Sequence, residues 1–345
     1  MADTAGDGTG PRAVTIASIA QSAGVSVPTV SKVLNGRSGV SPETRARIEG
    51  LIDQYGYRRP PHRSNVVELV FRELETMWAV EIIRGVERVA RRNRVGVVVS
   101  GYGREDSDGA GSPVEDTVER RPHAVLSVAR LSERERGQLT ASRIPFVVFD
   151  PVDELPDDVA FVGATNWRGG RSATRHLIDL GHRRVAMISG PDHAFCRARQ
   201  AGYTSAMAAA GLAVDPELVV STQLTREAGC AAGRALLALA ERPTAIFAAN
   251  DMQALGVYQA AREAGLAIPA DLSVVGFDDL PVVAWMDPPL TSVHQPLAEM
   301  AAAATELALA LGRGEPAPQL GMEIATTLAV RASTAPPPGA PRPSE

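Results

Sequence analysis

Cysteine, lysine and long apolar runs are all scarce in this sequence. The two cysteines, Cys196 and Cys230, stand far apart, and the one lysine is Lys32. Two isolated cysteines cannot build a disulfide framework, and none of the six histidines has metal-ligand spacing, so we expect neither a metal nor a cofactor. No apolar run reaches about 18 residues, and the first residues lack the apolar core of a secretion signal. We therefore expect a cytoplasmic protein that makes no contact with a membrane.

Motifs of common enzymes are also absent. Gly101-Tyr102-Gly103 lacks the third glycine of a dinucleotide-binding fingerprint. The sequence contains no phosphate-binding loop and no Gly-x-Ser-x-Gly turn. We therefore expect a protein that is not an enzyme.

Charge is distributed unevenly along the 345 residues. The net charge is −5, yet residues 11–63 carry eight basic and only three acidic side chains. A basic segment on an acidic body is expected when one module contacts phosphate and the other does not. Length and the 45% hydrophobic content suggest about two domains.

Composition divides the chain into five segments. Residues 1–12 and the proline-rich residues 332–345 are predicted to be disordered tails. Residues 13–56 show helical periodicity only and belong to a small domain predicted over residues 13–59, and the adjacent prolines within residues 60–67 predict a linker. Residues 68–331 form the remaining, larger domain.

The small domain is predicted to contain three short helices. Thr15 can cap a helix over residues 16–23, which Gly24 ends, and Ser26 can cap a second helix that runs to about Leu34. A third helix opens at Ser41. Two helices joined by such a short turn form a helix-turn-helix unit, whose second helix can enter a major groove.

The large domain alternates between strands and helices. Apolar runs rich in β-branched residues are separated by amphipathic helices, which predicts parallel sheets covered on both faces. The predicted strands are Leu69–Phe71, Val95–Ser100, Ala124–Val128, Pro145–Phe149, Val185–Ser189, Ala245–Ala248 and Ser273–Phe277. Sheets of this kind bind ligands at the carboxyl ends of their strands.

Residues 14–36 resemble the DNA-binding headpiece of the lactose-repressor (LacI/GalR) family, and the match continues through residues 40–45 and 56–58. The resemblance implies that three side chains of the second helix face base edges, namely Val27, Pro28 and Lys32. It also implies phosphate contacts, or support for them, from Thr15, Ser26, Thr29, Ser31, Asn35 and Tyr57. Val27 and Pro28 cannot form paired hydrogen bonds with a base, so Lys32 is expected to be the main polar reader.

The linker departs from the family pattern. Family members usually carry here a helix with an Ala-Leu wedge that enters the minor groove, whereas residues 60–66 are shorter and lack that leucine. We hypothesise that no hinge helix forms. Arg58, Arg59 and Arg63 would then follow the DNA backbone or the minor groove through their charge alone.

Short stretches across residues 66–331 are similar, in order, to the sensor domain of the same family. The resemblance implies an α/β two-lobed domain like that of periplasmic sugar-binding proteins, behind an all-α headpiece. The first lobe would comprise about residues 66–165 and 296–321 and supply a homodimer surface. The second would comprise about residues 166–294 and 322–331.

Polar residues follow several of the predicted strands. Asp150, Asn250 and Asp278 each come directly after a strand, and Arg199 opens a later helix. Carboxylates accept hydrogen bonds and a guanidinium donates two, so this set suits the vicinal hydroxyls of an uncharged sugar. The alternative for each Asp or Asn is a helix cap.

Aromatic faces are expected to cover the apolar side of a sugar ring. The candidates are Trp78, Trp167 and Phe195, with Trp285 as another. The resemblance adds Gln295 to the ligand-binding set.

We therefore predict a sequence-specific transcription regulator. Two headpieces of a homodimer would bind a palindromic double-stranded operator, and a mono- or disaccharide between the lobes would change operator affinity. Repression of carbohydrate-use genes is the expected outcome. Three alternatives stay open: a purine or other co-repressor with the same DNA role, a sugar-binding protein without DNA function, and an enzyme on the same scaffold. A larger aromatic share facing the pocket would favour the purine.

Overall fold

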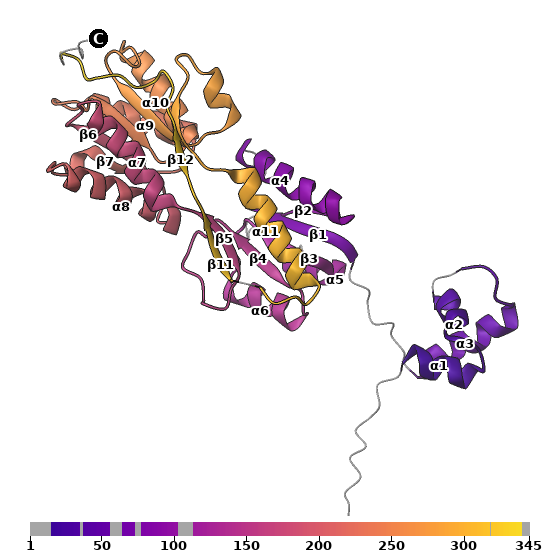
Figure 1. Ribbon diagram of the computed structural model, residues 1–345. Coiled ribbons are helices and arrows are strands. Elements are labelled where there is room, and N and C mark those ends of the chain that lie inside the picture. Colours follow the sequence, from indigo (N-terminus) through magenta and orange to yellow (C-terminus); the bar gives the residue numbers. More distant parts are fainter. Residues whose placement is uncertain are drawn as a thin grey trace, which may run out of the picture. The chain divides into compact units, whose positions relative to one another are not determined.

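The fold is that of a computed structural model, which describes residues 15–34, 37–55, 64–72, 77–102, 113–317 and 319–339. The chain divides into two compact units, Met1–Arg63 and Ser64–Glu345, and each is described by itself (Figure 1). The predicted N-terminal tail, the course of the three linker arginines and the hinge region at residues 60–63 lie outside the described residues.

The small unit contains the three predicted helices, α1 (Ile16–Ala23), α2 (Val27–Leu34) and α3 (Pro42–Gln54). Thr15 and Ser18 form a capping box at the start of α1, and Gly24 ends that helix with a left-handed φ of 62°. The core consists of apolar side chains from all three helices: Ile19, Ala20, Ala23, Val30, Val33 and Ile48. This packing fixes which face of α2 remains outside.

The large unit contains two six-stranded sheets, which form two lobes (Figure 1). The first sheet has the order β11-β5-β4-β3-β1-β2 and is parallel throughout. Its strands are β1 (Ser64–Phe71), β2 (Gly96–Gly101), β3 (Pro122–Ser127), β4 (Phe146–Phe149), β5 (Phe161–Ala164) and β11 (Gly321–Ile324). Helices α4 (Met77–Asn93) and α11 (Leu297–Gly312) cover one face, while α5 (Pro113–Arg120) and α6 (Glu133–Ala141) pack on the other.

The second sheet has the order β12-β10-β9-β8-β6-β7. Its strands are β6 (Val185–Ser189), β7 (Val219–Ser221), β8 (Ala245–Ala248), β9 (Ser273–Asp278), β10 (Thr291–His294) and β12 (Thr327–Ala329), and only β12 runs antiparallel to its neighbour. Helices α7 (Asn166–Asp179) and α8 (Ala194–Ala209) cover one face, and α9 (Arg226–Leu237) and α10 (Asp251–Glu263) the other. β6, β8 and β9 are buried along their whole length, as expected of strands covered on both faces.

The chain crosses between the two sheets three times. The crossings are at Thr165, at residues 295–296 and at residues 325–326. The hydroxyl of Thr165 accepts a hydrogen bond from Thr326 N over 2.9 Å, which ties the first crossing to the third. Residues 322–324 had been predicted in the second lobe, but they form β11 of the first sheet.

The large unit begins earlier and ends later than predicted. β1 starts at Ser64, whose backbone N donates to Arg121 O over 2.8 Å, so the second half of the predicted linker is strand. The predicted disordered tail is described as far as Gly339, and Ser333 is fully buried with its hydroxyl donating to Val274 O over 2.6 Å. Prolines exclude regular structure from this segment, but they do not prevent it from packing along β9.

Candidate functional site

The outer face of α2 carries the side chains that were predicted to read DNA. Val27 is 41% exposed, and Pro28 and Lys32 are exposed as well. Thr29 and Ser31 are half-buried on the same helix. The face that α2 leaves exposed therefore carries one cation and two small apolar side chains.

The predicted phosphate-contacting residues are partly engaged within the headpiece. The Thr15 hydroxyl accepts from Ser18 N over 3.2 Å, and the hydroxyls of Ser26 and Thr29 lie 2.9 Å apart. These contacts hold the hydroxyls at the two helix starts, where they can support a phosphate contact. Asn35, Tyr57 and Arg58 lie outside the described residues.

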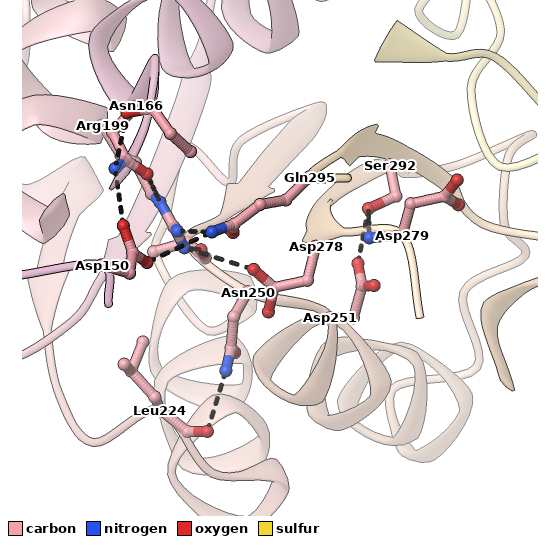
Figure 2. A network of polar contacts seen from close by, with 12 residues as sticks. Asp150, Asn166, Arg199, Leu224, Asn250, Asp251, Asp278, Asp279, Ser292 and Gln295 are labelled. Carbon is pink, nitrogen blue, oxygen red and sulfur yellow. Dashed lines mark hydrogen bonds and ion pairs between the residues drawn. The ribbon is translucent and has the colours of Figure 1, made fainter. Parts of the chain in front are cut away.

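Four of the predicted sensor residues meet in one buried polar network between the two lobes (Figure 2). Asp150 directly follows β4 of the first lobe, whereas Arg199, Asp278 and Gln295 come from the second. Gln295 Nε2 donates to Asp150 Oδ2 over 3.2 Å, and this bond joins the lobes. The network therefore lies where lobe movement would make or break it.

Asn166 joins the same network, although the sequence did not single it out as a ligand residue. It opens α7 and accepts from Arg199 Nε over 2.8 Å. Its amide donates to Ala164 O over 3.1 Å and, more weakly, to Asp150 Oδ1 over 3.4 Å. The strand that precedes it is only four residues long and contains Gly163, so the sequence held little signal for it.

Arg199 is held on all sides by the protein. Nη1 donates to Ala249 O over 2.6 Å and Nη2 to Gln295 Oε1 over 3.2 Å, while Nη1 lies 3.7 Å from Asp278 Oδ1. The guanidinium carbon lies 3.6 Å from the Phe277 ring centroid and 5.0 Å from that of Phe195. A ligand hydroxyl would therefore bind Arg199 by replacing one of these protein partners.

The acidic residues at the strand ends occupy unusual backbone conformations. Asp150 has a φ of 45° and Asp278 a φ of 104°, both in the region that disfavours side chains with a Cβ. Such strain is retained where the surrounding structure enforces it, and it is common at binding sites.

Burial favours the protonated form of two neighbouring carboxyls, those of Asp278 and Asp251. Burial raises the pKa of Asp278 to about 7, while Arg199 lowers it and Asp150 raises it. Burial and the neighbouring Asp278 also raise the pKa of Asp251 well above its usual range, although a hydrogen bond from Ser292 opposes this. Near neutral pH the carboxyls of Asp278 and Asp251 therefore carry less negative charge together than two fully ionised carboxylates would.

Two further acidic or amide residues have structural partners. Asn250 caps α10, because its Oδ1 accepts from Gln253 N over 2.9 Å, and its amide donates to Leu224 O over 3.0 Å. Asn250 therefore acts as a helix cap, the alternative expected for such residues. Asp279 pairs with Arg331 over 2.7 Å and with His294 over 3.1 Å, so it anchors the C-terminal segment.

The aromatic candidates separate into two groups. Phe195 and Trp167 line a cavity of about 610 Å³ that also contacts Asp150 and Asn166. Trp78 packs instead on the first lobe's core, with its ring centroid 5.9 Å from that of Phe149. Trp285 is 77% exposed and lies outside this cavity.

Family comparisons agree with this geometry. Residues 15–60 match the model for bacterial regulatory proteins of the lacI family, and residues 174–334 match the periplasmic binding protein-like domain. The transcriptional regulator MalR of Streptomyces coelicolor is 33% identical over 348 residues, covering 94% of this chain and 97% of MalR. This chain belongs to the LacI family.

Other LacI-family proteins are similar along most of the chain. The ribose operon repressor of Escherichia coli is 31% identical and covers 83% of this chain and 89% of its own length. The structure of a CelR–cellobiose complex has a TM-score of 0.71 at 32% identity, covering 93% of this chain and 99% of CelR. That of the lac repressor dimer bound to operator has a TM-score of 0.70 at 25% identity, covering 94% and 100%.

As a LacI-family protein, the chain is a DNA-binding transcription regulator and not an enzyme. None of the helices in the described residues has both the length and the apolar character needed to cross a bilayer. Within those residues, no group of three or more His, Cys, Asp or Glu side chains is arranged to hold a metal ion.

Proposed function

We propose that this regulator represses carbohydrate-use genes and that a small sugar bound between its lobes changes its operator affinity. The observation that carries the proposal is the buried network of Asp150, Asn166, Arg199, Asp278 and Gln295 at the strand ends of both lobes. The names of similar regulators, among them a ribose operon repressor and a CelR–cellobiose complex, support the sugar class.

Hydroxyl exchange explains how a sugar could act on this network. Each sugar hydroxyl both donates and accepts, so it can take the place of the Gln295 amide between Asp150 and Arg199. That exchange removes the direct Asp150–Gln295 bond and substitutes a bond through the ligand. A ligand unable to satisfy both partners would leave a buried polar group unpaired, at a cost of about 1–3 kcal/mol.

On the DNA side, the proposal assigns base reading to Lys32 and shape contacts to Val27 and Pro28 on the exposed face of α2. Two copies of the chain would read the half-sites of a palindrome about one helical turn apart. A solved relative is a lac repressor dimer bound to operator, which supports this assembly. Because the target is chromosomal DNA, we place the regulator in the cytoplasm.

The test starts from the operator itself. Duplexes bound by the purified full-length protein are selected from a random pool, and the recovered operator is labelled for fluorescence anisotropy. A panel of pentoses, hexoses and disaccharides is then titrated into the complex. We expect at least one sugar to change operator affinity by about 5- to 150-fold, the usual range of allosteric coupling. Operator binding that no sugar in the panel alters would refute the sugar effector, and a failure to select any duplex would refute the DNA role.

A further inference from the structure

Three helices of the first lobe end on an arginine in a backbone conformation that favours glycine. α4, α5 and α6 each lead into the next strand through such a residue, at Arg94 (φ 56°), Arg121 (φ 48°) and Arg143 (φ 55°). Left-handed backbone costs free energy in any residue that carries a Cβ. Five other helices among the described residues end in the same conformation, and all of them use glycine: Gly24, Gly181, Gly211, Gly265 and Gly314. The backbone therefore does not explain why arginine stands at the three positions.

The three arginines lie along one edge of the first sheet. Arg94 precedes β2, Arg121 precedes β3 and Arg143 precedes β4, and these strands stand together with β1 in the parallel order β4-β3-β1-β2. Parallel strands all begin at the same edge of a sheet, so the turns that lead into them lie there as well. This edge is opposite to the one at which Asp150 follows β4. A surface at this edge is therefore separate from the ligand network between the lobes.

The chain enters the large unit between two of these turns. At the start of β1, Ser64 N donates to Arg121 O over 2.8 Å, and on the other side Asn65 Nδ2 donates to Arg94 O over 2.8 Å. Only eight residues separate Ser64 from Tyr55, the last described residue of the headpiece. Whatever its course, a stretch of this length can span no more than about 32 Å. The edge is thus tethered close to the domain that binds operator.

Positive charge is concentrated on this half of the edge. The segments 91–95, 119–121 and 142–145 lead into β2, β3 and β4, and they carry one acidic side chain, Glu119, against six arginines: Arg91, Arg92, Arg94, Arg120, Arg121 and Arg143. Arg91 is neutralised by Glu87 over 2.5 Å, and Arg120 by the buried Glu68.

The other half of the edge has the opposite character. The segments 156–160 and 313–320 lead into β5 and β11, and they carry Asp157, Asp158 and an ion pair between Arg313 and Glu315. The basic character is therefore confined to the half at which the chain from the headpiece enters.

Three of the arginines are placed to meet an anion from outside. Arg92, Arg94 and Arg143 are exposed, and we call them the basic edge; Arg121 is half-buried. Arg92 and Arg94 form no ion pair with any described residue. A guanidinium is the side chain best suited to bind phosphate. Backbone strain that is kept at neighbouring positions indicates that the side chains serve something other than the fold.

We propose that the basic edge is a second DNA contact, at which the first lobe binds backbone phosphates of the duplex that the headpiece reads. Duplex DNA carries one negative charge for about every 1.7 Å of its axis, so arginines held close to it meet phosphates at any sequence. An acidic protein would offer the same charge, but it is DNA that the connectivity of the chain brings to this edge. The proposal rests on the DNA-binding role of the headpiece and not on the nature of the effector.

A triple variant tests the contact, with the substitutions Arg92→Gln, Arg94→Asn and Arg143→Asn. Glutamine is a good helix former for position 92, and asparagine tolerates the left-handed backbone at positions 94 and 143. The melting temperature of the large unit should therefore not fall. If the triple variant does unfold, the single variant Arg92→Gln leaves both left-handed turns intact and is measured in the same way.

The matched control removes three exposed arginines from other parts of the large unit, with Arg134→Gln, Arg175→Gln and Arg183→Gln. Arg134 lies in the first turn of α6, at the other end of that helix from Arg143. Arg175 and Arg183 belong to the second lobe. Both triple variants thus lose the same charge, but only one of them loses the basic edge.

The measurement is the affinity of the full-length protein for the selected operator and for a scrambled duplex of the same length, by fluorescence anisotropy. Salt is varied from about 50 to 200 mM, a range over which each phosphate contact accounts for roughly a 3.5-fold loss of affinity. In the triple variant, the slope of log affinity against log salt should become shallower by about 1 or more. Binding at low salt should weaken by the same factor on both duplexes, because phosphate contacts carry no sequence information. The control should keep the wild-type slope.

The outcomes separate this contact from the DNA-binding role. An unchanged slope in a folded triple variant overturns the contact and points to an acidic protein at this edge. Equal reductions in both triple variants would overturn it too, since they would show a general effect of net charge. A loss confined to the operator would mean that base recognition is disturbed and that the phosphate contact is wrong. If the wild type binds neither duplex, it is the DNA-binding role itself that fails.

Discussion

The guanidinium carbon of Arg199 lies 3.6 Å from the ring centroid of Phe277. Phe277 belongs to β9, and Asp278 directly follows it, so one strand end supplies both the aromatic support and the counter-charge for this arginine. Hydrogen bonds from Arg199 to Asn166, Ala249 and Gln295 fix the plane of the guanidinium. Its orientation is therefore set before any ligand arrives.

Replacing Arg199 by lysine should abolish the sugar response while selective operator binding persists. A lysine keeps the charge but loses the planar fork that contacts Asn166 and Gln295 together and stacks on Phe277. The response is measured by operator anisotropy with and without the active sugar. Arg197→Lys is the control, because Arg197 lies on the same helix but is half exposed and pairs with Asp192. An undiminished sugar response in Arg199→Lys would remove Arg199 from the site.

Lys32→Ala should weaken operator binding about 10- to 100-fold, since a specific side-chain contact to a base edge contributes about 1–3 kcal/mol. The preference at one base position of each half-site should relax, and the affinity for sugar should not change. Arg47→Ala serves as the control, because it removes an exposed cation of α3 rather than of α2. Equal losses in both variants, with no change in base preference, would show that Lys32 contributes only general charge.

Asp278 should make stability depend on pH. Its pKa is raised to about 7 in the folded protein, so between about pH 4 and pH 7 the unfolded chain loses this proton while the folded chain keeps it. This group therefore lowers the free energy of unfolding as pH rises through that window, and its effect levels off above about 7. The raised pKa of Asp251 also lowers the free energy of unfolding as pH rises. The lowered pKa values of His176, His182 and His193 have the opposite effect and raise it.

The contribution of Asp278 is isolated by comparing the wild type with Asp278→Asn in urea unfolding at about pH 5 and about pH 8. The variant should gain stability relative to the wild type as pH rises. A difference between the two proteins that stays constant with pH would mean that Asp278 titrates normally in the folded state.

Gly170→Ala should destabilise the large unit by about 1–3 kcal/mol, the usual cost of overpacking. A Cβ at Gly170 would lie 2.1 Å from Arg199 O, so α7 and α8 would have to separate and Arg199 would shift. Thermal unfolding and sugar binding are measured together. In Gly137→Ala, at α6 of the same unit, the added methyl meets nothing within 4 Å, so the large unit should not be destabilised and sugar binding should not change.

Removing residues 332–345 should lower the melting temperature of the large unit, although prolines make this segment look dispensable. Ser333 is fully buried, and the Ala335 carbonyl accepts hydrogen bonds from His182 and Ser273. A protein that ends at Gly339 keeps these contacts and is the matched control. Equal melting temperatures for the two truncated proteins would show that the segment adds no stability.

Much of the fold could be predicted from periodicity and capping. Every strand predicted from an apolar run is present, and the three headpiece helices begin and end close to their predicted caps. The unpredicted strands, such as β5 and β12, have only four and three residues, too few for an alternating pattern to show.

The site could be predicted only where a residue followed a recognisable strand. Asp150 and Asp278 met this condition, whereas Asn166 follows β5 and was missed as a ligand residue. Arg199 was predicted to open a helix, but α8 begins at Ala194 and Arg199 lies in its second turn. Trp78 stays a prediction as a ligand contact: it is half-buried, and its ring packs at Phe149, because an aromatic at the start of a helix can also pack on a core. Which partner Gln295 would find in the other lobe depends on the relative placement of the two sheets, which local sequence does not encode.

The most direct test of the account is reciprocity between the two ligands. The dissociation constant of the active sugar is measured by calorimetry for the free protein and for its complex with operator. Because coupling between two sites is mutual, operator should change sugar affinity by the same factor by which sugar changes operator affinity. Matching factors are the predicted result; a sugar that binds equally well with and without operator would contradict the account.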